Sequence, residues 1–357
     1  MKSKAMVVVE PNRLEMQEFE VVPPAPDQIL VKTTVTSVCS SDIKFFHGTF
    51  AANKYPLIMG HEISGRVVEI GAEAAGWYGL RPGDAVTVEP YIPCGRCQDS
   101  RSEHFYHHCQ HGGIYGLNLA CDQPPHLFGG YSEYLYILPG TLVHRVGPEV
   151  DPMAASLSSV VANGVRWVKT LGRITFGESV VISGPGSQGL SALAAAKTAG
   201  AEPIIVLGLS RDTARLELAR EFGADYTFDV EKEDPVQVVT GLLPQGADAV
   251  IETSGTPEGI QAAVKMVRRA GRVVSIGLSG GLETPIHFDD LVWRSISILC
   301  GVGQAGNVDD AMKLIRSGRF DFAKINNTTY KLEELGQALK DTEERPEGFI
   351  KGAVVFD

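Results

Sequence analysis

The chain of 357 residues lacks two features that would direct it to nucleic acid or to a membrane. Basic residues are not in excess, because 32 lysines and arginines stand against 43 aspartates and glutamates and leave a formal net charge of −11 at pH 7. Nucleic acids and anionic membrane surfaces favour clustered lysine and arginine, so neither is expected as a main partner. No apolar run reaches the length of a membrane span: the nearest, at 192–209, is interrupted by Lys197, Glu202 and Pro203.

Cysteine is also sparse, since six residues are too few for a disulfide-stabilised scaffold of this length. We therefore expect metal ligands or free thiols. No targeting segment is expected, because Met1-Lys2-Ser3-Lys4 leads directly into a strand-like stretch at 5–9. Internal repeats, low-complexity tracts and long linkers are missing too. Together these absences predict a globular protein of the cytoplasm.

What is present divides the chain into two parts, as its length suggests. Residues 1–155 consist of short strand-like stretches such as 29–35 and 85–88, separated by glycine, proline, asparagine and aspartate, and predict a mostly β domain. Residues 156–300 alternate between apolar strands and helices, which predicts a parallel sheet covered on both faces.

A glycine-rich turn stands at the centre of the second part. Gly184-Pro185-Gly186-Ser187-Gln188-Gly189 follows an apolar strand at 180–183 and opens a helix at 187–199, which is the context of a dinucleotide-binding G-x-G-x-x-G motif. The first glycine permits the tight turn, the second lets a pyrophosphate approach the backbone, and the third lets helix and strand pack closely. The N–H groups at the start of the helix, including those of Ser187 and Gln188, would hold the phosphate charge.

The choice of cofactor is predicted from the end of the next strand, at 204–207. An NAD site generally has an acidic residue there, but this chain offers Gly208, Ser210 and Arg211. Arginine can bind a 2′-phosphate, so NADP(H) is favoured over NAD(H), although Arg211 could equally be a solvated arginine at a helix start. Thr253 and Gly277 end later strands and are expected at the nicotinamide end.

Three residues of the first part could bind a metal. Cys39, in Cys39-Ser40-Ser41-Asp42, and the pair His61-Glu62 supply the thiolate, imidazole and carboxylate that suit zinc, and three ligands leave one position open. About twenty residues separate the cysteine from the pair, so only the fold can bring them together. Taken singly, Cys39 could be a buried small hydrophobe and His61 a hydrogen-bonded loop residue.

With these motifs in one order, the chain resembles the zinc-dependent medium-chain alcohol and polyol dehydrogenase family. The resemblance covers essentially the whole chain. It implies an α/β fold with a doubly wound Rossmann domain at 156–300, a mostly β, GroES-like catalytic domain at 1–155 and 301–357, and an active site in the cleft between them. The resemblance rests on Cys39-x-Ser41-Asp42, Gly60-His61-Glu62-x-x-Gly65, Arg81-Pro82-Gly83-Asp84, Gly129-Gly130-Tyr131-Ser132-Glu133-Tyr134 and the glycine-rich turn.

The resemblance also implies residue roles. A catalytic zinc would be held by Cys39 and His61, with Glu62 as a further ligand or neighbour, and Asp42 would orient the ligands. Ser41 would take the proton of the alcohol, and since a hydroxyl can only relay a proton, His47 or Lys44 would pass it to solvent. A histidine before Gly48 could instead simply shape a turn.

Two departures from the family pattern concern zinc. Cys94, Cys97 and Cys109 resemble a structural zinc loop, but Ser100 stands where a further cysteine is usual. The missing ligand could be Asp99, His104, His107 or His108, or the loop could have lost its metal. Ser159 stands near the position of a Cys or Glu that usually faces the catalytic metal, so weak zinc occupancy is predicted. Cys121 is predicted to be a free thiol.

The predicted activity is hydride transfer between a secondary alcohol or polyol, or the matching ketone, and NADP(H) or NAD(H). Two alternatives stay open: a zinc-free medium-chain reductase, and a non-catalytic nucleotide-binding redox regulator on the same fold. The expected partner is a small molecule, and the family resemblance implies a homodimer or homotetramer.

Overall fold

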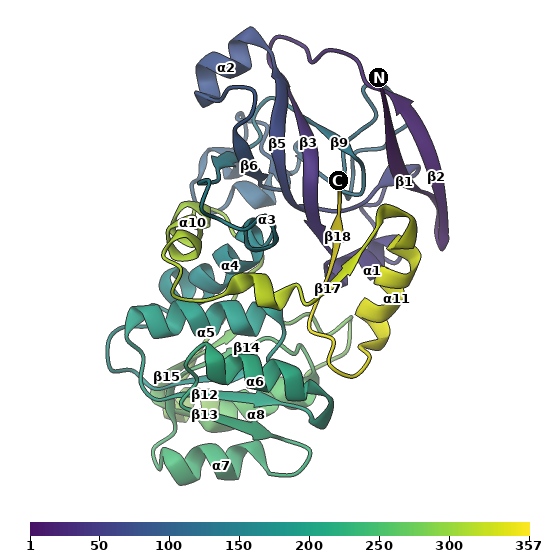
Figure 1. Cartoon of the computed structure of the whole chain (residues 1–357). Helices are drawn as coiled ribbons and strands as arrows, with labels where there is room; N and C mark the ends of the chain where they lie inside the picture. The colour runs from purple at the N-terminus through teal and green to yellow at the C-terminus, as the bar shows by residue number, and fades with distance from the viewer. The chain divides into compact units, whose positions relative to one another are not determined.

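The computed structural model describes all 357 residues, and the chain folds into two compact units (Figure 1). The first unit comprises Met1–Ser159 and Met312–Asp357, and the second comprises Val160–Ala311. The chain therefore leaves the first unit, builds the second and returns. No helix in either unit is both long enough and apolar enough to cross a membrane.

The first unit contains two main sheets. A three-stranded sheet has the order β2-β1-β4, in which β1 and β2 form an antiparallel hairpin closed at Asn12, whose φ is 67°. Asparagine tolerates this left-handed conformation better than most residues. The larger sheet has the order β10-β6-β5-β3-β18-β17, with β9 also paired to β3. The strands are β1 (Lys2–Glu10), β2 (Arg13–Glu20), β3 (Ile29–Ser37), β4 (Leu57–Ile58), β5 (Glu62–Ile70), β6 (Ala85–Val88), β9 (Tyr134–Ile137), β10 (Val143–Arg145), β17 (Thr328–Tyr330) and β18 (Gly352–Val355).

Strand β3 is the centre of this unit because both of its faces are buried. Successive side chains of a strand point to opposite faces. Leu30 accordingly packs into one apolar cluster with Val8 and Val354, while Ile29 and Val31 pack into another on the opposite side. A strand buried on both sides holds the residues that follow it firmly in place, and Cys39 follows β3.

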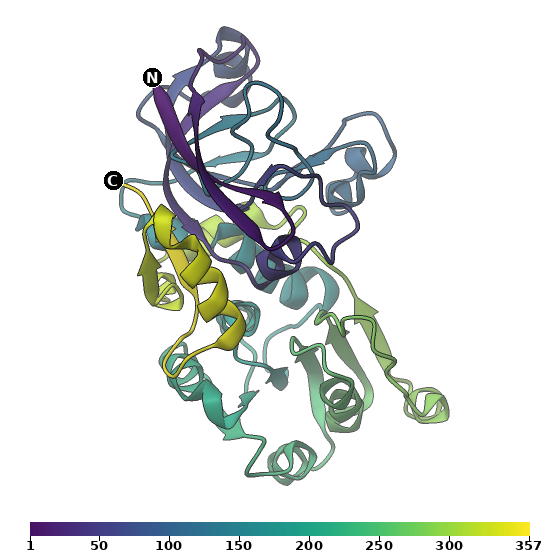
Figure 2. The same cartoon turned by 90° about the vertical axis from the view of Figure 1, so that its right-hand side faces the viewer.

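Short helices complete the unit, and those within residues 1–155 were not predicted by the strand-like pattern of that part, whereas the helical pattern at 333–342 agrees with the last helix. Helix α1 (Ser40–Phe46) follows β3 directly, and α11 (Leu335–Glu344) packs against it and against β18 (Figure 2). The other short elements are α2 (Ala72–Tyr78), α3 (Pro152–Ala155), the helical turns η1 (Asp99–Arg101) and η2 (Tyr106–His108), and the hairpin of β7 (Tyr91–Ile92) and β8 (Gly113–Ile114).

The second unit is a six-stranded parallel sheet with the order β13-β12-β11-β14-β15-β16. Its central strands β11, β12 and β14 are mostly apolar and buried, as expected when helices cover both faces, and α5 packs on α6 while α7 packs on α8. The predicted Rossmann-type sheet is thus confirmed, including the strand at 180–183 and the helix at 187–199. The strands are β11 (Val180–Ser183), β12 (Ile204–Gly208), β13 (Tyr226–Asp229), β14 (Ala247–Glu252), β15 (Val267–Ser275) and β16 (Ser297–Cys300); the helices are α5 (Ser187–Ala199), α6 (Thr213–Glu221), α7 (Pro235–Leu242), α8 (Pro257–Met266) and α9 (Phe288–Arg294), and α4 (Ser158–Val165) and α10 (Val308–Arg316) cross the unit boundaries.

Candidate active site

Cys39 lies at the start of α1, where it is the N-cap residue in an extended conformation. Its backbone N–H donates a hydrogen bond to Oδ2 of Asp42 at 3.0 Å, and Asp42 is the third residue of the helix. An acidic side chain at this position satisfies a backbone donor that the helix leaves free. The local sequence Cys39-x-x-Asp42 therefore determines where the thiol lies.

The register of β3 and β5 closes the gap between Cys39 and the His61-Glu62 pair. Glu62 begins β5 and lies opposite Ser37 at the end of β3. As a result, one ligand atom each of Cys39, His61 and Glu62 lies within 4.8 Å of the others. The structure thus brings together the three residues predicted as metal ligands.

The arrangement of His61 fits a zinc ligand. Its Nδ1 lies 3.2 Å from Oδ1 of the fully buried Asp42, while its Nε2 lies on the side of Ser41, 3.5 Å from the hydroxyl. A carboxylate behind one ring nitrogen sets the ring orientation and leaves the other nitrogen for a metal. Burial opposes a charge on the ring, but Asp42 and Cys39 outweigh it and raise the pKa of His61 well above its usual range.

Asp42 is itself supported by Tyr131, which sequence reasoning quoted only as part of a motif. The Tyr131 hydroxyl donates to Oδ2 of Asp42 at 2.6 Å, and both side chains are completely buried. Burial and the Asp42 charge raise the pKa of Tyr131 well above its usual range, so the phenol stays a donor.

Sequence reasoning missed Lys351 altogether. Its Nζ lies 2.9 Å from Oε2 of Glu62 and donates to the carbonyl oxygen of Val38, also at 2.9 Å. The only signal was a lysine within the apolar run Phe349-Ile350-Lys351-Gly352-Ala353, since a buried charge requires a partner. That signal does not identify the partner.

The two residues predicted to move a proton lie in different surroundings. The Ser41 hydroxyl donates to Sγ of Cys39 at 3.2 Å and is part of the cluster. His47 ends α1, and its ring nitrogens face Asn12 and Glu343, with 3.5 Å between Nε2 and Oε1 of Glu343. The relay through His47 stays a prediction. Ser159 lies buried in α4 and is not among the clustered ligands.

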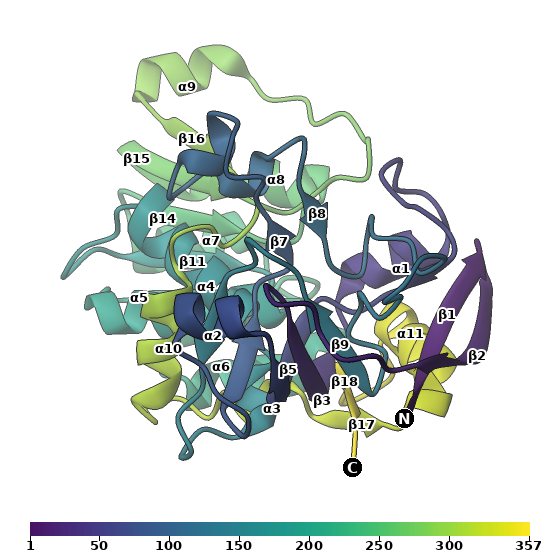
Figure 3. The same ribbon diagram turned by 90° about the horizontal axis from the view of Figure 1, so that it is seen from above.

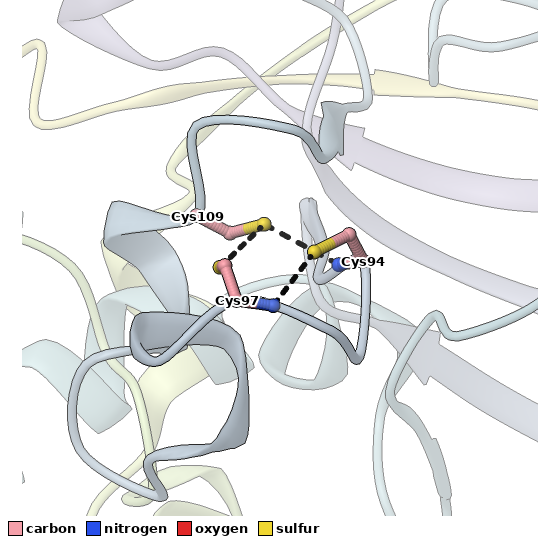
Figure 4. Close-up of side chains that lie close together, drawn as sticks. All are labelled: Cys94, Cys97 and Cys109. Atoms are coloured by element: carbon pink, nitrogen blue, oxygen red, sulfur yellow. Dashed lines mark hydrogen bonds between the residues drawn. The ribbon is translucent and has the colours of Figure 1, made fainter.

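The three cysteines of the predicted structural loop also converge (Figure 4). Sγ of Cys97 lies 3.7 Å from Sγ of Cys109, and the Cys94 N–H donates to Sγ of Cys109 at 3.3 Å. No histidine or carboxylate belongs to this group, and Ser100 lies beside it, with its Oγ 3.5 Å from Sγ of Cys94. This hydroxyl, together with backbone N–H groups, lowers the pKa of Cys94 to about 6. Cys121 lies elsewhere as a buried free thiol, and burial raises its pKa to about 11.

Each of the three glycines of the nucleotide turn occupies its position for a different structural reason. Gly184 has a φ of +103°, which favours glycine, and a Cβ on Gly189 would lie 2.0 Å from the Gly184 carbonyl oxygen. A Cβ on Gly186 would meet nothing within 4 Å, so the space before α5 is open. Ser187 and Gln188 are the first residues of α5, where backbone N–H groups have no partner within the helix, and the Gln188 side chain accepts a hydrogen bond from Trp167 at 3.4 Å. Thr253 lies 2.9 Å from the carbonyl oxygens of Ser183 and Gly184.

Two carboxylates lie beside the end of β12, and they come from a later part of the chain, at and after the end of β13. Ser210 donates from its backbone N–H to Glu231 at 2.8 Å and from its hydroxyl to Asp229 at 2.6 Å. They reach Ser210 because β13 pairs in parallel with β12, with Gly208 opposite Asp229. Lys232 pairs with Asp229 at 2.8 Å.

Two further residues shape the end of the neighbouring strands. Glu252 is fully buried at the end of β14, where it accepts hydrogen bonds from the backbone N–H groups of Ser254 and Gly255. A Cβ on Gly277 would lie 2.1 Å from the Gly255 nitrogen, so the two loops touch through bare backbone. Sequence reasoning had placed Thr253 and Gly277 here but had not singled out Glu252.

Comparison with known proteins identifies the family. The family model for the alcohol dehydrogenase GroES-like domain matches residues 25–148, and the model for zinc-binding dehydrogenases matches residues 189–317. A Mycobacterium tuberculosis protein described as a probable alcohol dehydrogenase is 34% identical over 337 residues, which cover 92% of this chain and 91% of that protein. The chain belongs to the zinc-type medium-chain alcohol dehydrogenase family. This dehydrogenase is also 34% identical, over 324 residues, to the L-threonine 3-dehydrogenase of Pyrococcus horikoshii, covering 89% of this chain and 88% of that enzyme.

Solved structures agree with this dehydrogenase over its whole length. An alcohol dehydrogenase from Thermotoga maritima superposes with a TM-score of 0.91 at 26% identity, covering 99% of both chains. A Sinorhizobium meliloti 1021 protein described as a zinc-binding dehydrogenase bound to NADP superposes with a TM-score of 0.89 at 26% identity, covering 100% of both. The protein is therefore an oxidoreductase, and the expected combination of a Rossmann-type sheet with a GroES-like domain is confirmed.

Proposed function

We propose that this dehydrogenase transfers a hydride between a secondary alcohol or polyol, or the matching ketone, and NADP(H) or NAD(H), with zinc as its catalytic metal. The observation that supports this is the convergence of Cys39, His61 and Glu62 in front of a buried aspartate. When bound, the zinc lowers the pKa of an alcohol oxygen or polarises a ketone. The domain with these ligands, 1–155 and 301–357, is the proposed catalytic domain, and 156–300 is the proposed nucleotide-binding domain.

The residues around this site have distinct proposed tasks. Asp42 holds the His61 ring so that Nε2 is available as a ligand. Ser41 contacts both Cys39 and His61, and its hydroxyl receives the proton of the alcohol. His47 then passes the proton to solvent, since it is partly exposed and an imidazole can both accept and donate a proton.

For the cofactor we infer binding across the ends of β11 and β12, with NADP(H) preferred over NAD(H). Open space at Gly186 and the first N–H groups of α5 favour a pyrophosphate there. Arg211 is exposed beside Ser210, and the NADP-bound relative supports the preference. Of the two carboxylates that contact Ser210, Asp229 is paired with Lys232, whereas Glu231 opposes a 2′-phosphate, so the proposed preference depends on Arg211.

We further propose that Cys94, Cys97 and Cys109 hold a structural zinc with one additional ligand. The convergence of the three sulfur atoms supports this, and the Ser100 hydroxyl, which lies 3.5 Å from Sγ of Cys94, is the proposed additional ligand. A neutral hydroxyl is a weak zinc ligand, so this zinc should exchange more readily than one held by four thiolates.

We propose a homodimer or homotetramer of the cytoplasm that acts on a small molecule. Strand β16 is the outer strand of its sheet, and α9 lies beyond it (Figure 3). Trp293, Phe288 and Val292 of α9 are 80%, 70% and 62% exposed. An open strand edge next to exposed apolar side chains favours contact with a second copy.

The decisive experiment measures zinc content and turnover together. Wild-type and Cys39→Ala proteins are loaded with zinc, washed and analysed for metal, and both are assayed against a panel of alcohols and ketones with each cofactor. We expect the variant to lose one zinc per chain and nearly all turnover. Equal zinc and equal turnover in both proteins would contradict the proposal and favour a zinc-free reductase.

A further inference from the structure

Lys351 is a buried cation for which hydride transfer by itself gives no role. Only 6% of its side chain and 3% of the Glu62 side chain are exposed, and 2.9 Å separates Nζ from Oε2. Burying either charge alone would be costly, so each depends on the other in the absence of a metal.

Backbone pairing fixes the position of the lysine. Strand β18 begins at the next residue and pairs with the end of β3, where the Val38 N–H donates to the Gly352 carbonyl oxygen at 2.8 Å. Nζ donates in turn to the Val38 carbonyl oxygen. Since Cys39 follows Val38, the ammonium is anchored one residue from the proposed thiolate ligand.

The charges of the site give this anchored ammonium a consequence. Cys39, Glu62 and Asp42 are anionic when they serve a zinc ion. Burial opposes the charge of Lys351, but the attraction of these three groups, that of Glu62 first, outweighs it and raises the pKa of the lysine. A zinc ion and Lys351 would thus share the negative charge of the same Glu62 carboxylate.

We propose that Lys351 is a positioning residue that shares Glu62 with the metal and limits the negative charge that Glu62 donates to zinc. The inference rests on the proposed zinc site. A carboxylate held by an ammonium is a weaker ligand, so the zinc keeps more of its positive charge for the substrate oxygen and is bound less tightly. Lys351 therefore favours reactivity over metal affinity.

The test measures zinc affinity by competition with a chelator in Lys351→Met, which keeps the length of the side chain without its charge. We expect tighter zinc binding than in wild type by about 10–100-fold; this is the size of the loss seen when a partner that strengthens a metal ligand is removed, and the sign is reversed here because Lys351 weakens its ligand. kcat should fall, because the metal is less electrophilic, while KM changes less.

Lys351→Arg keeps the charge and should not bind zinc more tightly than wild type. Lys197→Met removes a lysine paired with Asp225 in the other unit and should leave zinc affinity unchanged.

The same substitution in a Glu62→Gln background shows whether the effect passes through Glu62. We expect Lys351→Met to change zinc affinity much less there. Unchanged or weaker zinc binding in folded Lys351→Met, or an equal effect in both backgrounds, would overturn the proposal. If Lys351→Met does not fold, Lys351→Gln, which keeps a donor for the Val38 carbonyl, is used with the same expected result.

Failure of this inference is distinguishable from failure of the proposed function. Zinc that Cys39→Ala still binds is assigned to the three-cysteine loop and subtracted from every measurement. A Cys39→Ala protein with wild-type zinc affinity at both sites would remove the catalytic zinc itself. A normal Cys39→Ala result together with no gain in Lys351→Met would remove only the role of Lys351.

Discussion

Asp42 is the residue on which the contacts of the site converge. Its two oxygens lie near the Tyr131 hydroxyl, the Cys39 N–H and Nδ1 of His61, at 2.6, 3.0 and 3.2 Å. A buried carboxylate is tolerated only when such donors compensate for lost water. The same donors also fix its orientation, so stability and metal binding depend on one set of contacts.

Tyr131→Phe is expected to weaken both properties. The variant loses a hydrogen bond to a charged group, which is worth about 1.5–3 kcal/mol, and the His61 ring is held less firmly. Tyr136→Phe is the matched control, because Tyr136 is equally buried but exchanges hydrogen bonds only with the neutral backbone N–H and carbonyl of Val22. Urea denaturation should show a stability loss in both variants, and chelator competition should show weaker zinc binding in Tyr131→Phe alone. Equal behaviour of the two variants would contradict this role of Tyr131.

At the scale of elements, glycine has two different roles in the turn between β11 and α5: one glycine allows close packing and another leaves open space. Adding a Cβ at Gly189 forces the helix away from the Gly184 carbonyl oxygen, whereas a Cβ at Gly186 meets only open space. Close packing and room for a ligand are thus provided by different residues of one motif.

Gly189→Ala should therefore lose stability as well as cofactor binding, by about 1–3 kcal/mol for the overpacking. Gly186→Ala should unfold at the wild-type temperature but bind NADPH and NADH more weakly, since the methyl group occupies the space proposed for the pyrophosphate. Thermal unfolding and fluorescence titration check this. Normal cofactor binding by Gly186→Ala would place the pyrophosphate elsewhere.

A second element-scale contact joins the starts of β11, β14 and β15. Asp248 accepts hydrogen bonds from the N–H and hydroxyl of Ser179, at 2.8 and 2.7 Å, and from Arg268 at 2.6 Å. Burial opposes the charge, but Ser179 and Arg268 outweigh it and lower the pKa of Asp248. A depressed pKa in the folded state adds stability above the unfolded pKa, which is about 3.9 for aspartate, and this stability is lost as pH falls through the folded value.

Asp248→Asn should consequently be less stable than wild type at pH 7 by about 1–3 kcal/mol, because charge-assisted hydrogen bonds are lost. The difference should shrink below pH 4, where wild type loses the same contribution. Urea denaturation at several pH values measures it. A difference that stays constant down to the lowest pH at which the protein folds would show that the carboxylate charge is not responsible.

At the scale of the whole molecule, the proposed contact between two copies of the chain rests on the exposed apolar side chains of α9. Trp293→Glu should shift the protein toward the monomer in sedimentation velocity, because a charge there opposes burial against a second copy. Trp77→Glu is the matched control, since Trp77 is also exposed, at 62%, but lies on α2 of the other unit. An unchanged oligomer in Trp293→Glu would exclude this face as the interface.

The sequence by itself determined the fold class and the nucleotide turn of this dehydrogenase. Both follow from local patterns: apolar strands alternate with helices in 156–300, and the spacing of Gly184, Gly186 and Gly189 suits a single turn. The sequence also predicted Cys39, His61 and Glu62 as zinc ligands, because their residue types suit zinc.

The tertiary structure alone decided which partners these residues have. Lys351 reaches Glu62 through the pairing of β18 with β3, and Asp229 reaches Ser210 through the pairing of β13 with β12. Helix α1, which positions Cys39, was not predicted, since its short sequence shows little helical periodicity. Strand register is a property of the folded sheet, and it determines contacts between residues that no local spacing connects.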